Sequence, residues 1–123
     1  MIKVSIDTDI LIDYSKDRDT VLDKLLSEKN VELYVNPVVI AEFLADQNLG
    51  SQKKLDEALD FLSRFKMINI NKKIGIETGR IMRKVPSLNW KDAMIAACCL
   101  VENCRLATRN QKHFNKITGL KFV

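Results

Sequence analysis

Residues 4–13 read VSIDTDILID, and this stretch decides the fold. It opens with a short apolar run of the kind that forms a buried strand, and the run stops at Asp7. After Asp9 the apolar residues resume, in a segment expected to turn into a short helix. In sheets built from such strand and helix units, ligands bind beyond the carboxyl ends of the strands. The residues that directly follow each predicted strand are therefore the first candidates for a functional site.

Short apolar runs alternate with helical patterns along the whole 123-residue chain. The predicted strands are residues 3–6, 32–35, 67–70 and 105–107, with 121–123 a weaker fifth. The predicted helices are one after a cap at Asp19 or Thr20, then 37–45, 55–65 and 72–84, and last a helix capped by Asn89 that contains the apolar run 93–101. This order predicts a single α/β domain over residues 1–123. We expect three α/β/α layers, with a mostly parallel sheet of four or five strands and helices on both faces.

The composition suits a protein with its own apolar core, because 46% of the residues are hydrophobic. No stretch approaches the roughly 20 apolar residues of a membrane span, and Asp7 and Asp9 interrupt the region where a signal peptide would be apolar. We therefore expect a cytoplasmic protein without a membrane partner. The three cysteines at 98, 99 and 104 lack the spacing of a zinc site and are expected to be small core residues.

Charge is distributed unevenly along the chain. Residues 1–70 hold 9 Lys and Arg against 13 Asp and Glu, whereas residues 71–123 hold 11 against 3. Such a division suits a protein that binds metal with its acidic part and phosphate with its basic part. A mixed, solvated surface explains the same pattern, since basic surface attracts many polyanions without specificity.

Three acids stand out by their surroundings, although each has a purely structural explanation. Asp7 follows the first strand and could cap the next helix, and Asp92 follows Asn89 at the position of a capping box. Glu42 is the only polar residue within an apolar stretch, so it is either buried and partnered or part of an exposed strip. Three carboxylates near one sheet edge repel one another unless a cation lies between them. Oxygen ligands without histidine or thiolate favour Mg²⁺ or Mn²⁺ over zinc.

The segment LATRNQKHF at residues 106–114 follows the fourth predicted strand. Thr108 and Asn110 could form hydrogen bonds to a carboxylate, and Arg109 and Lys112 could face phosphate. An ordinary polar turn is the alternative. His113 is interpreted as a surface histidine, and we assign it no metal role.

Together, Asp7-Thr8-Asp9, Glu42, Asp92 and Thr108-Arg109-Asn110 resemble the motifs of the PIN-domain family, in the family's order and over essentially the whole chain. Within the family the sequence is similar to VapC-type toxins of toxin–antitoxin pairs. The resemblance implies a Mg²⁺-dependent endoribonuclease that forms a homodimer and is inhibited by a small antitoxin.

The resemblance also implies roles for particular residues. Asp7, Glu42 and Asp92 would be the acidic metal-site residues, and Asn110 stands where many members carry a fourth acid, which leaves the number of metal ions open. Thr8 and Thr108 match small polar positions that support the site, and Asp9 is expected to have a supporting role. Apart from the resemblance, basic residues such as Arg80, Arg83, Arg109 and Lys112 could hold the flanking phosphate backbone.

Three other functions are weighed against this one. A phosphatase of the haloacid dehalogenase type also begins with Asp-x-Asp, but Leu11 stands where it needs threonine or valine. A receiver domain needs an Asp after the third strand, where this chain has Asn71. A PIN-like module that binds RNA or a protein without cutting is the third alternative, and the presence of all three main acids argues against it.

Overall fold

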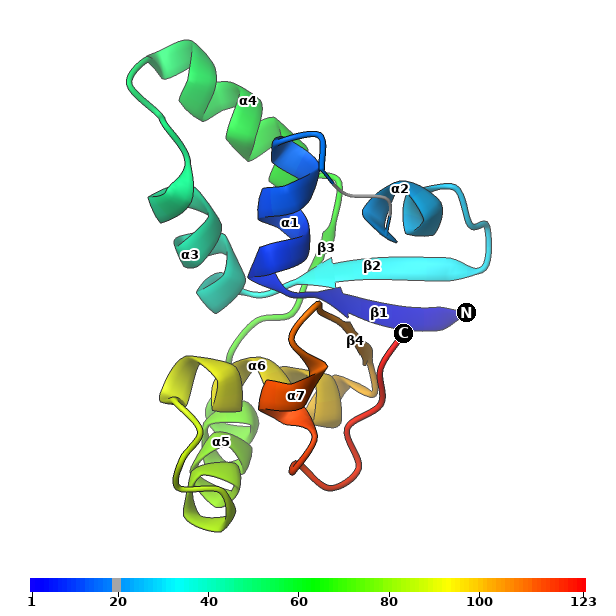
Figure 1. The fold of residues 1–123 in the computed structure, drawn as a ribbon, viewed down its shortest axis with the longest axis vertical. Coiled ribbons are helices and arrows are strands. Elements are labelled where there is room, and N and C mark those ends of the chain that lie inside the picture. Colours follow the sequence, from blue (N-terminus) through cyan, green and yellow to red (C-terminus); the bar gives the residue numbers. More distant parts are fainter. Residues whose placement is uncertain (19–20) are drawn as a thin grey trace.

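The computed structural model describes residues 1–18 and 21–123, which contain a four-stranded sheet ordered β3-β2-β1-β4 (Figure 1). Every neighbouring pair in this sheet is parallel. The strands are β1 (Ile2–Ile6), β2 (Val31–Val35), β3 (Lys66–Met67) and β4 (Arg105–Ala107). The predicted parallel α/β architecture is therefore confirmed. Strand β1, which Asp7 follows, lies between β2 and β4.

Helices cover both faces of the sheet, as predicted. Figure 1 shows α1 to α4 on one side and α5 to α7 on the other. Their bounds are α1 (Thr8–Ser15), α2 (Val21–Leu26), α3 (Pro37–Asp46), α4 (Gln52–Leu62), α5 (Lys72–Lys84), α6 (Trp90–Glu102) and α7 (Gln111–Phe114). The cap predicted at Asp19 or Thr20 lies outside the described residues. Among the described helices, none is long and apolar enough to cross a membrane.

Two strand predictions need correction. The strand predicted at 67–70 is β3, which ends at Met67, although the N–H of Ile68 still donates to the carbonyl of Val35 at 2.8 Å. The chain then begins α5 after Asn71, whose side chain accepts a hydrogen bond from Ile74 N. The weak fifth strand at 121–123 is only an isolated bridge between Phe122 and Leu106. Both segments lie at the edges of the sheet, where few strand partners are available.

The helix boundaries follow local capping chemistry. Asn89 caps α6 as predicted, its side chain accepting from Asp92 N at 2.9 Å, and Asn103 ends the helix in the left-handed conformation at φ 56°. The helical stripe predicted to reach Phe65 stops earlier, because α4 ends at Leu62. Phe65 is nevertheless buried and meets the ring of Phe61 edge-on.

Helix α6 is the buried helix of the fold. Its residues Ala93 and Ile95 to Cys99 are almost completely inaccessible, and they belong to one core cluster with Ile6 of β1 and Leu106 of β4. All three cysteines are free and buried, as expected for small core residues. Burial raises the pKa of the Cys98 thiol to about 12 and that of Cys104 to about 11. The apolar run of α6 thus fixes the helix that carries Asp92 against the sheet.

We predict that Asn36→Ala lowers the free energy of unfolding by about 1–2 kcal/mol. Asn36 is completely buried, and its side chain accepts from the N–H of Val39 at 3.1 Å in the first turn of α3. Water cannot replace this partner in the interior. Urea denaturation measures the effect. Ser51→Ala is the matched control, because the Ser51 hydroxyl caps the exposed start of α4 in the same way, accepting from Lys54 N at 3.2 Å. Equal losses in the two variants would contradict the role given to burial.

Candidate metal and nucleic-acid site

The candidate site begins where β1 and β4 end side by side. Asp7 follows β1 and Thr108 follows β4, and the Thr108 hydroxyl donates to Asp7 Oδ2 at 2.7 Å. The backbone N–H of Thr8 donates to Asp7 Oδ1 at 2.8 Å. Asp7 is only 6% exposed, so its carboxyl group is buried with both oxygens oriented by the protein. Asp7 therefore caps α1, the structural role weighed in the sequence, and also lies at the sheet edge proposed for ligand binding.

Asp9 ties the first turn of α1 to the loop after β4. Its Oδ2 atom accepts from Arg109 N at 3.1 Å and from Asn110 Nδ2 at 3.2 Å, with the Thr108 hydroxyl at 3.4 Å. The Thr108 hydroxyl in turn accepts from Asn110 N at 3.0 Å, which leaves its single hydrogen for the shorter bond to Asp7. Asp9 thus positions the loop after β4, and Thr108 in that loop orients Asp7. The Oδ1 atom of Asp9 is buried and has no hydrogen-bond partner in the described structure.

Glu42 joins this network from α3, but it is less buried than its apolar neighbours indicated. The Thr8 hydroxyl donates to Glu42 Oε1 at 2.8 Å, and Lys91 Nζ lies 3.7 Å from Oε2. The Glu42 side chain is 31% exposed, and the adjacent Ala41 is exposed. Of the two alternatives left open, the structure shows features of both, because Glu42 is partnered by Thr8 and only one face of α3 packs against the core. Glu42 lies at the boundary of that face.

Asp92 enters from the first turn of α6. Asn89 Nδ2 donates to Asp92 Oδ2 at 3.0 Å, so a cap-related contact is present alongside any functional role. The side chain of Asp92 is 21% exposed, and His113 Nδ1 lies 4.0 Å from its Oδ2 atom. His113 itself is 64% exposed, in agreement with its interpretation as a surface histidine.

The acids of the site influence one another electrostatically. Burial raises the pKa of Asp7 to about 6, and the charges of Asp9 and Asp92 push it in the same direction against the hydrogen bonds from Thr108 and Thr8. Burial also raises the pKa of Asp9 and of Asp92, and the charge of Glu42 adds to the shift at Asp92. The network thus carries excess negative charge in a poorly solvated place. A cation is the natural compensation for such a cluster.

The donor chemistry fits a hard divalent cation, but the side chains are not gathered around a single point. The four acids offer only oxygen ligands, and the unpartnered Asp9 Oδ1 is an available acceptor. Within residues 1–18 and 21–123, however, no group of three or more Asp, Glu, His or Cys side chains is arranged to hold a metal ion. Asp7, Glu42 and Asp92 are each bonded to protein donors instead. Binding one cation to all three would require some of these side chains to turn.

The structure divides the predicted phosphate-facing cations into two kinds. Arg109 is engaged within the protein, with Nε 2.8 Å from Asp13 Oδ2, and Arg80 pairs with Glu77 one turn earlier in α5. Both guanidinium groups are paired with acids in this structure, and their contact with phosphate stays a prediction. Lys112 is exposed beside His113, while Arg83 is exposed on α5 and lines none of the hollows described below.

Sequence reasoning missed Asp13. Its side chain is 6% exposed and bridges Arg109 to Arg18, whose Nη2 lies 3.3 Å from Asp13 Oδ1. The available signal was spacing, because Asp9 and Asp13 are four residues apart and so share one face of α1. Asp13 holds Arg109, and with it the loop after β4, against α1.

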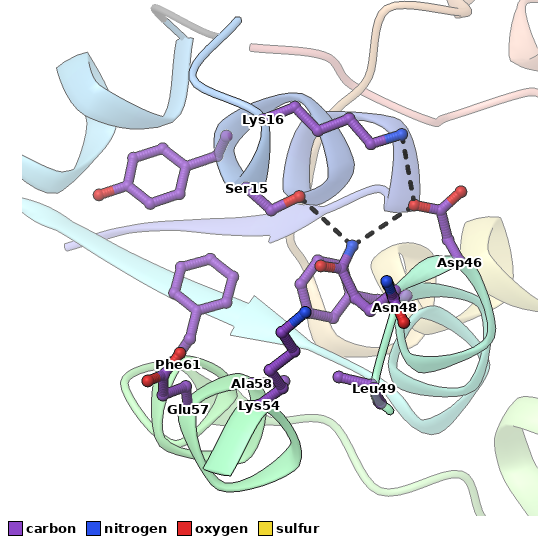
Figure 2. A pocket seen from close by; sticks show the side chains of 12 residues that line it. Ser15, Lys16, Asp46, Asn48, Leu49, Lys54, Glu57, Ala58 and Phe61 are labelled. Atoms are coloured by element: carbon purple, nitrogen blue, oxygen red, sulfur yellow. Dashed lines mark hydrogen bonds and ion pairs between the residues drawn. The ribbon is translucent and has the colours of Figure 1, made fainter. Parts of the chain in front are cut away.

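A hollow lies between α1, α3 and α4, away from the candidate acids (Figure 2). Its volume is about 720 Å³, and its wall includes the side chains of Tyr14, Phe43 and Phe61. Its rim carries charges of both signs, with Lys16 Nζ 3.7 Å from Asp46 Oδ2. None of the candidate acids lines it.

Comparison with known proteins agrees with this geometry. The PIN domain model matches residues 4–120. Ribonuclease VapC1 of Methanocaldococcus jannaschii is 29% identical over 126 residues, which cover 97% of this chain and 85% of that protein.

Two solved structures have the same fold. VapBC2 from Rickettsia felis, bound to a DNA fragment from their promoter, has a TM-score of 0.82 at 27% identity, with 99% of this chain and 98% of that chain covered. A toxin–antitoxin complex from Klebsiella pneumoniae has a TM-score of 0.78 at 26% identity, with 95% and 94% covered. These matches favour a PIN domain over the dehalogenase and receiver alternatives.

Proposed function

This chain belongs to the PIN domain family, and from that premise we propose that it is a metal-dependent endoribonuclease, the toxin of a toxin–antitoxin pair. Two relatives support the specific activity and setting: one is named a ribonuclease, and another is a toxin–antitoxin complex. The proposal extends these properties to the present chain. Its substrate would be RNA and its place the cytoplasm.

One observation carries the proposal. Four acids from three separate segments approach the carboxyl edge of the sheet, and Asp7 among them is buried, with its pKa raised to about 6. A purely structural set of caps has no need for mutual repulsion of this kind. A site for Mg²⁺ or Mn²⁺ explains the clustering of the acids, because the charge of the bound cation offsets their repulsion.

We assign metal binding to Asp7, Glu42 and Asp92, and Asn110 to the fourth position of the site. When bound, the divalent cation would acidify a water molecule and offset charge on the phosphate oxygens. Thr8 and Thr108 orient the carboxylates of Glu42 and Asp7 through their hydroxyl groups. Asp9 holds the amide of Asn110 in place through its Oδ2 atom. These contacts orient the carboxylates of Asp7 and Glu42 and the amide of Asn110 in the metal-free protein.

A cognate antitoxin and a homodimer complete the proposal. A small protein that copurifies with the chain and suppresses its activity would be the expected antitoxin, and a neighbouring small gene for a DNA-binding protein would support it. Size-exclusion chromatography with light scattering tests the dimer directly.

The experiment compares wild type with Asp92→Asn on a set of structured RNAs in Mg²⁺ or Mn²⁺, with cleavage sites mapped by sequencing. We expect cleavage by wild type alone and its loss in EDTA. The asparagine keeps its backbone N–H for the cap at Asn89, so the variant should fold normally. Trp90, the only tryptophan and 53% exposed, lies two residues before Asp92 and reports metal binding through quenching by Mn²⁺.

Two outcomes would contradict the proposal. Equal cleavage by both proteins would indicate a contaminating ribonuclease. No cleavage of any RNA, together with no quenching of Trp90 by Mn²⁺, would favour the alternative of a PIN-like module that binds without cutting.

A further inference from the structure

We propose that two adjacent hollows, one of them lined by Asp92, form a channel for the phosphate backbone of single-stranded RNA, with Lys112 and Lys116 as its phosphate-binding residues. The inference rests on the proposed function, because it assumes that RNA is the substrate. It goes further by identifying which cations hold the chain and on which side of the acids the strand lies.

The two hollows meet at α7. One, of about 260 Å³, lies between the α5–α6 loop and α7 and is lined by Asn89, Asp92 and Lys116 among others. The other, of about 560 Å³, lies along the loop after β4. Both have Lys112 and His113 in their walls, so they lie next to each other, one beside Asp92 and the other beside Thr108. A strand lying in this channel would pass directly beside one of the proposed metal-binding acids.

The charges along the channel suit a polyanion. Lys112 and Lys116 are exposed, and neither forms an ion pair with an acid in the described part of the chain. Asp92 is the sole acid among the described residues that line the two hollows. A separate hollow of only about 20 Å³ also has Lys116 in its wall, together with Lys84 and Arg80. Lysines without intramolecular partners are free to replace the counterions of a phosphate backbone.

The arginines predicted for this purpose are less suitable. Arg109 also lines the hollow along the loop after β4, but its Nε is paired with Asp13, and Arg80 is paired with Glu77. The hollow of Figure 2 is a poor alternative, because its lysines are accompanied by Asp46 and Glu57 and none of the proposed metal-binding acids lines it. Apart from the His113 imidazole, no aromatic side chain lines the channel among the described residues, which favours backbone contacts over base stacking.

The test measures binding without cleavage. A fluorescein-labelled single-stranded RNA is titrated with protein in EDTA, and its anisotropy is followed at several salt concentrations. The variant Lys112→Gln/Lys116→Gln is compared with Lys29→Gln/Lys53→Gln, which removes the same charge elsewhere. Lys29 lies in the turn before β2 and Lys53 in α4, and both are exposed. Circular dichroism verifies that both variants are folded.

We expect the channel variant to bind RNA about tenfold more weakly at low salt, and its plot of log affinity against log salt to be shallower by about 0.7 for each lost phosphate contact. The control variant should remain close to wild type in both respects. Equal losses in the two variants would overturn the channel, since only overall charge would then matter. Unchanged RNA binding with weaker binding of polyglutamate would also overturn it, because the lysines would then serve an acidic protein.

Failure of the channel and failure of the proposed function are distinguishable. Metal-dependent cleavage by wild type with unchanged binding in the channel variant would reject the channel alone. Lysine-dependent binding without cleavage in either metal would support the channel and reject the nuclease.

Discussion

Asp7→Asn is expected to abolish RNA cleavage and, at the same time, to make the metal-free protein more stable at neutral pH. The two effects have one cause. The Asp7 carboxylate is placed where a cation would need it, in surroundings that disfavour its charge when no cation is bound. Asparagine removes the charge and keeps the shape. A purely structural helix cap would lose stability on the same substitution, or keep it unchanged.

The direction of the stability effect follows from the pKa of Asp7. Its ordinary value is 3.8, and burial raises it to about 6 in the folded protein. Between these two values the folded protein holds a proton that the unfolded chain has lost, so the free energy of unfolding falls as pH rises through this window. A shift of this size corresponds to about 3 kcal/mol, an upper figure before the site relaxes. The wild type therefore bears the full penalty above pH 6, and the variant does not.

Urea denaturation in EDTA at pH 4 and pH 7.5 measures this effect. The stability of Asp7→Asn relative to wild type should rise by about 2–3 kcal/mol between the two pH values. Asp60→Asn serves as control, because the Asp60 side chain is 77% exposed and should show no comparable change. Adding Mg²⁺ at pH 7.5 should stabilise wild type and leave Asp7→Asn unaffected. A variant that is less stable than wild type at pH 7.5 would refute the account.

The parts of the fold predicted correctly are those in which local chemistry and tertiary packing agree. Residues 105–107 and 72–84 were predicted with their observed bounds, and Asn89 caps α6 through the contact expected of it. The end of β1 at Asp7 was also clear, because an apolar run that stops at an acid has few alternatives. These signals are local, so a single sequence contains them.

The errors concern properties that depend on distant neighbours. The exposure of Glu42 is decided by which face of α3 meets the core, and the apolar residues around it do not reveal this. Residues 121–123 have the composition of a strand, but only Phe122 finds a bridge partner, at Leu106. The pairing of Arg109 with Asp13 was not predicted, because Asp13 is nearly a hundred residues away in the chain. Charge content was predictable, whereas charge pairing was not.

Asp9→Ala is expected to lower the rate of RNA cleavage by about 10- to 100-fold, the effect typical of residues that orient metal ligands. Asp9 Oδ2 is the common acceptor for Arg109 N and Asn110 Nδ2, and its side chain is only 13% exposed. Without it the loop after β4 keeps the Arg109–Asp13 pair but loses the hydrogen bonds of Arg109 N and Asn110 Nδ2 to α1, so Thr108 holds Asp7 less firmly. RNA binding in EDTA should be nearly unchanged, because the proposed channel lysines are untouched.

Asp9→Asn separates this positioning role from direct metal binding. Its amide oxygen can still accept from Arg109 N, so a positioning residue should recover part of the activity lost in Asp9→Ala. A metal ligand would lose activity as fully as Asp7→Asn does, since the negative charge disappears in both. The pKa of Asp7 adds a second readout, because removing the neighbouring charge should lower it and shift the window of pH-dependent stability downward. Full loss of activity in Asp9→Asn, with Mn²⁺ no longer quenching Trp90, would place Asp9 among the metal ligands instead.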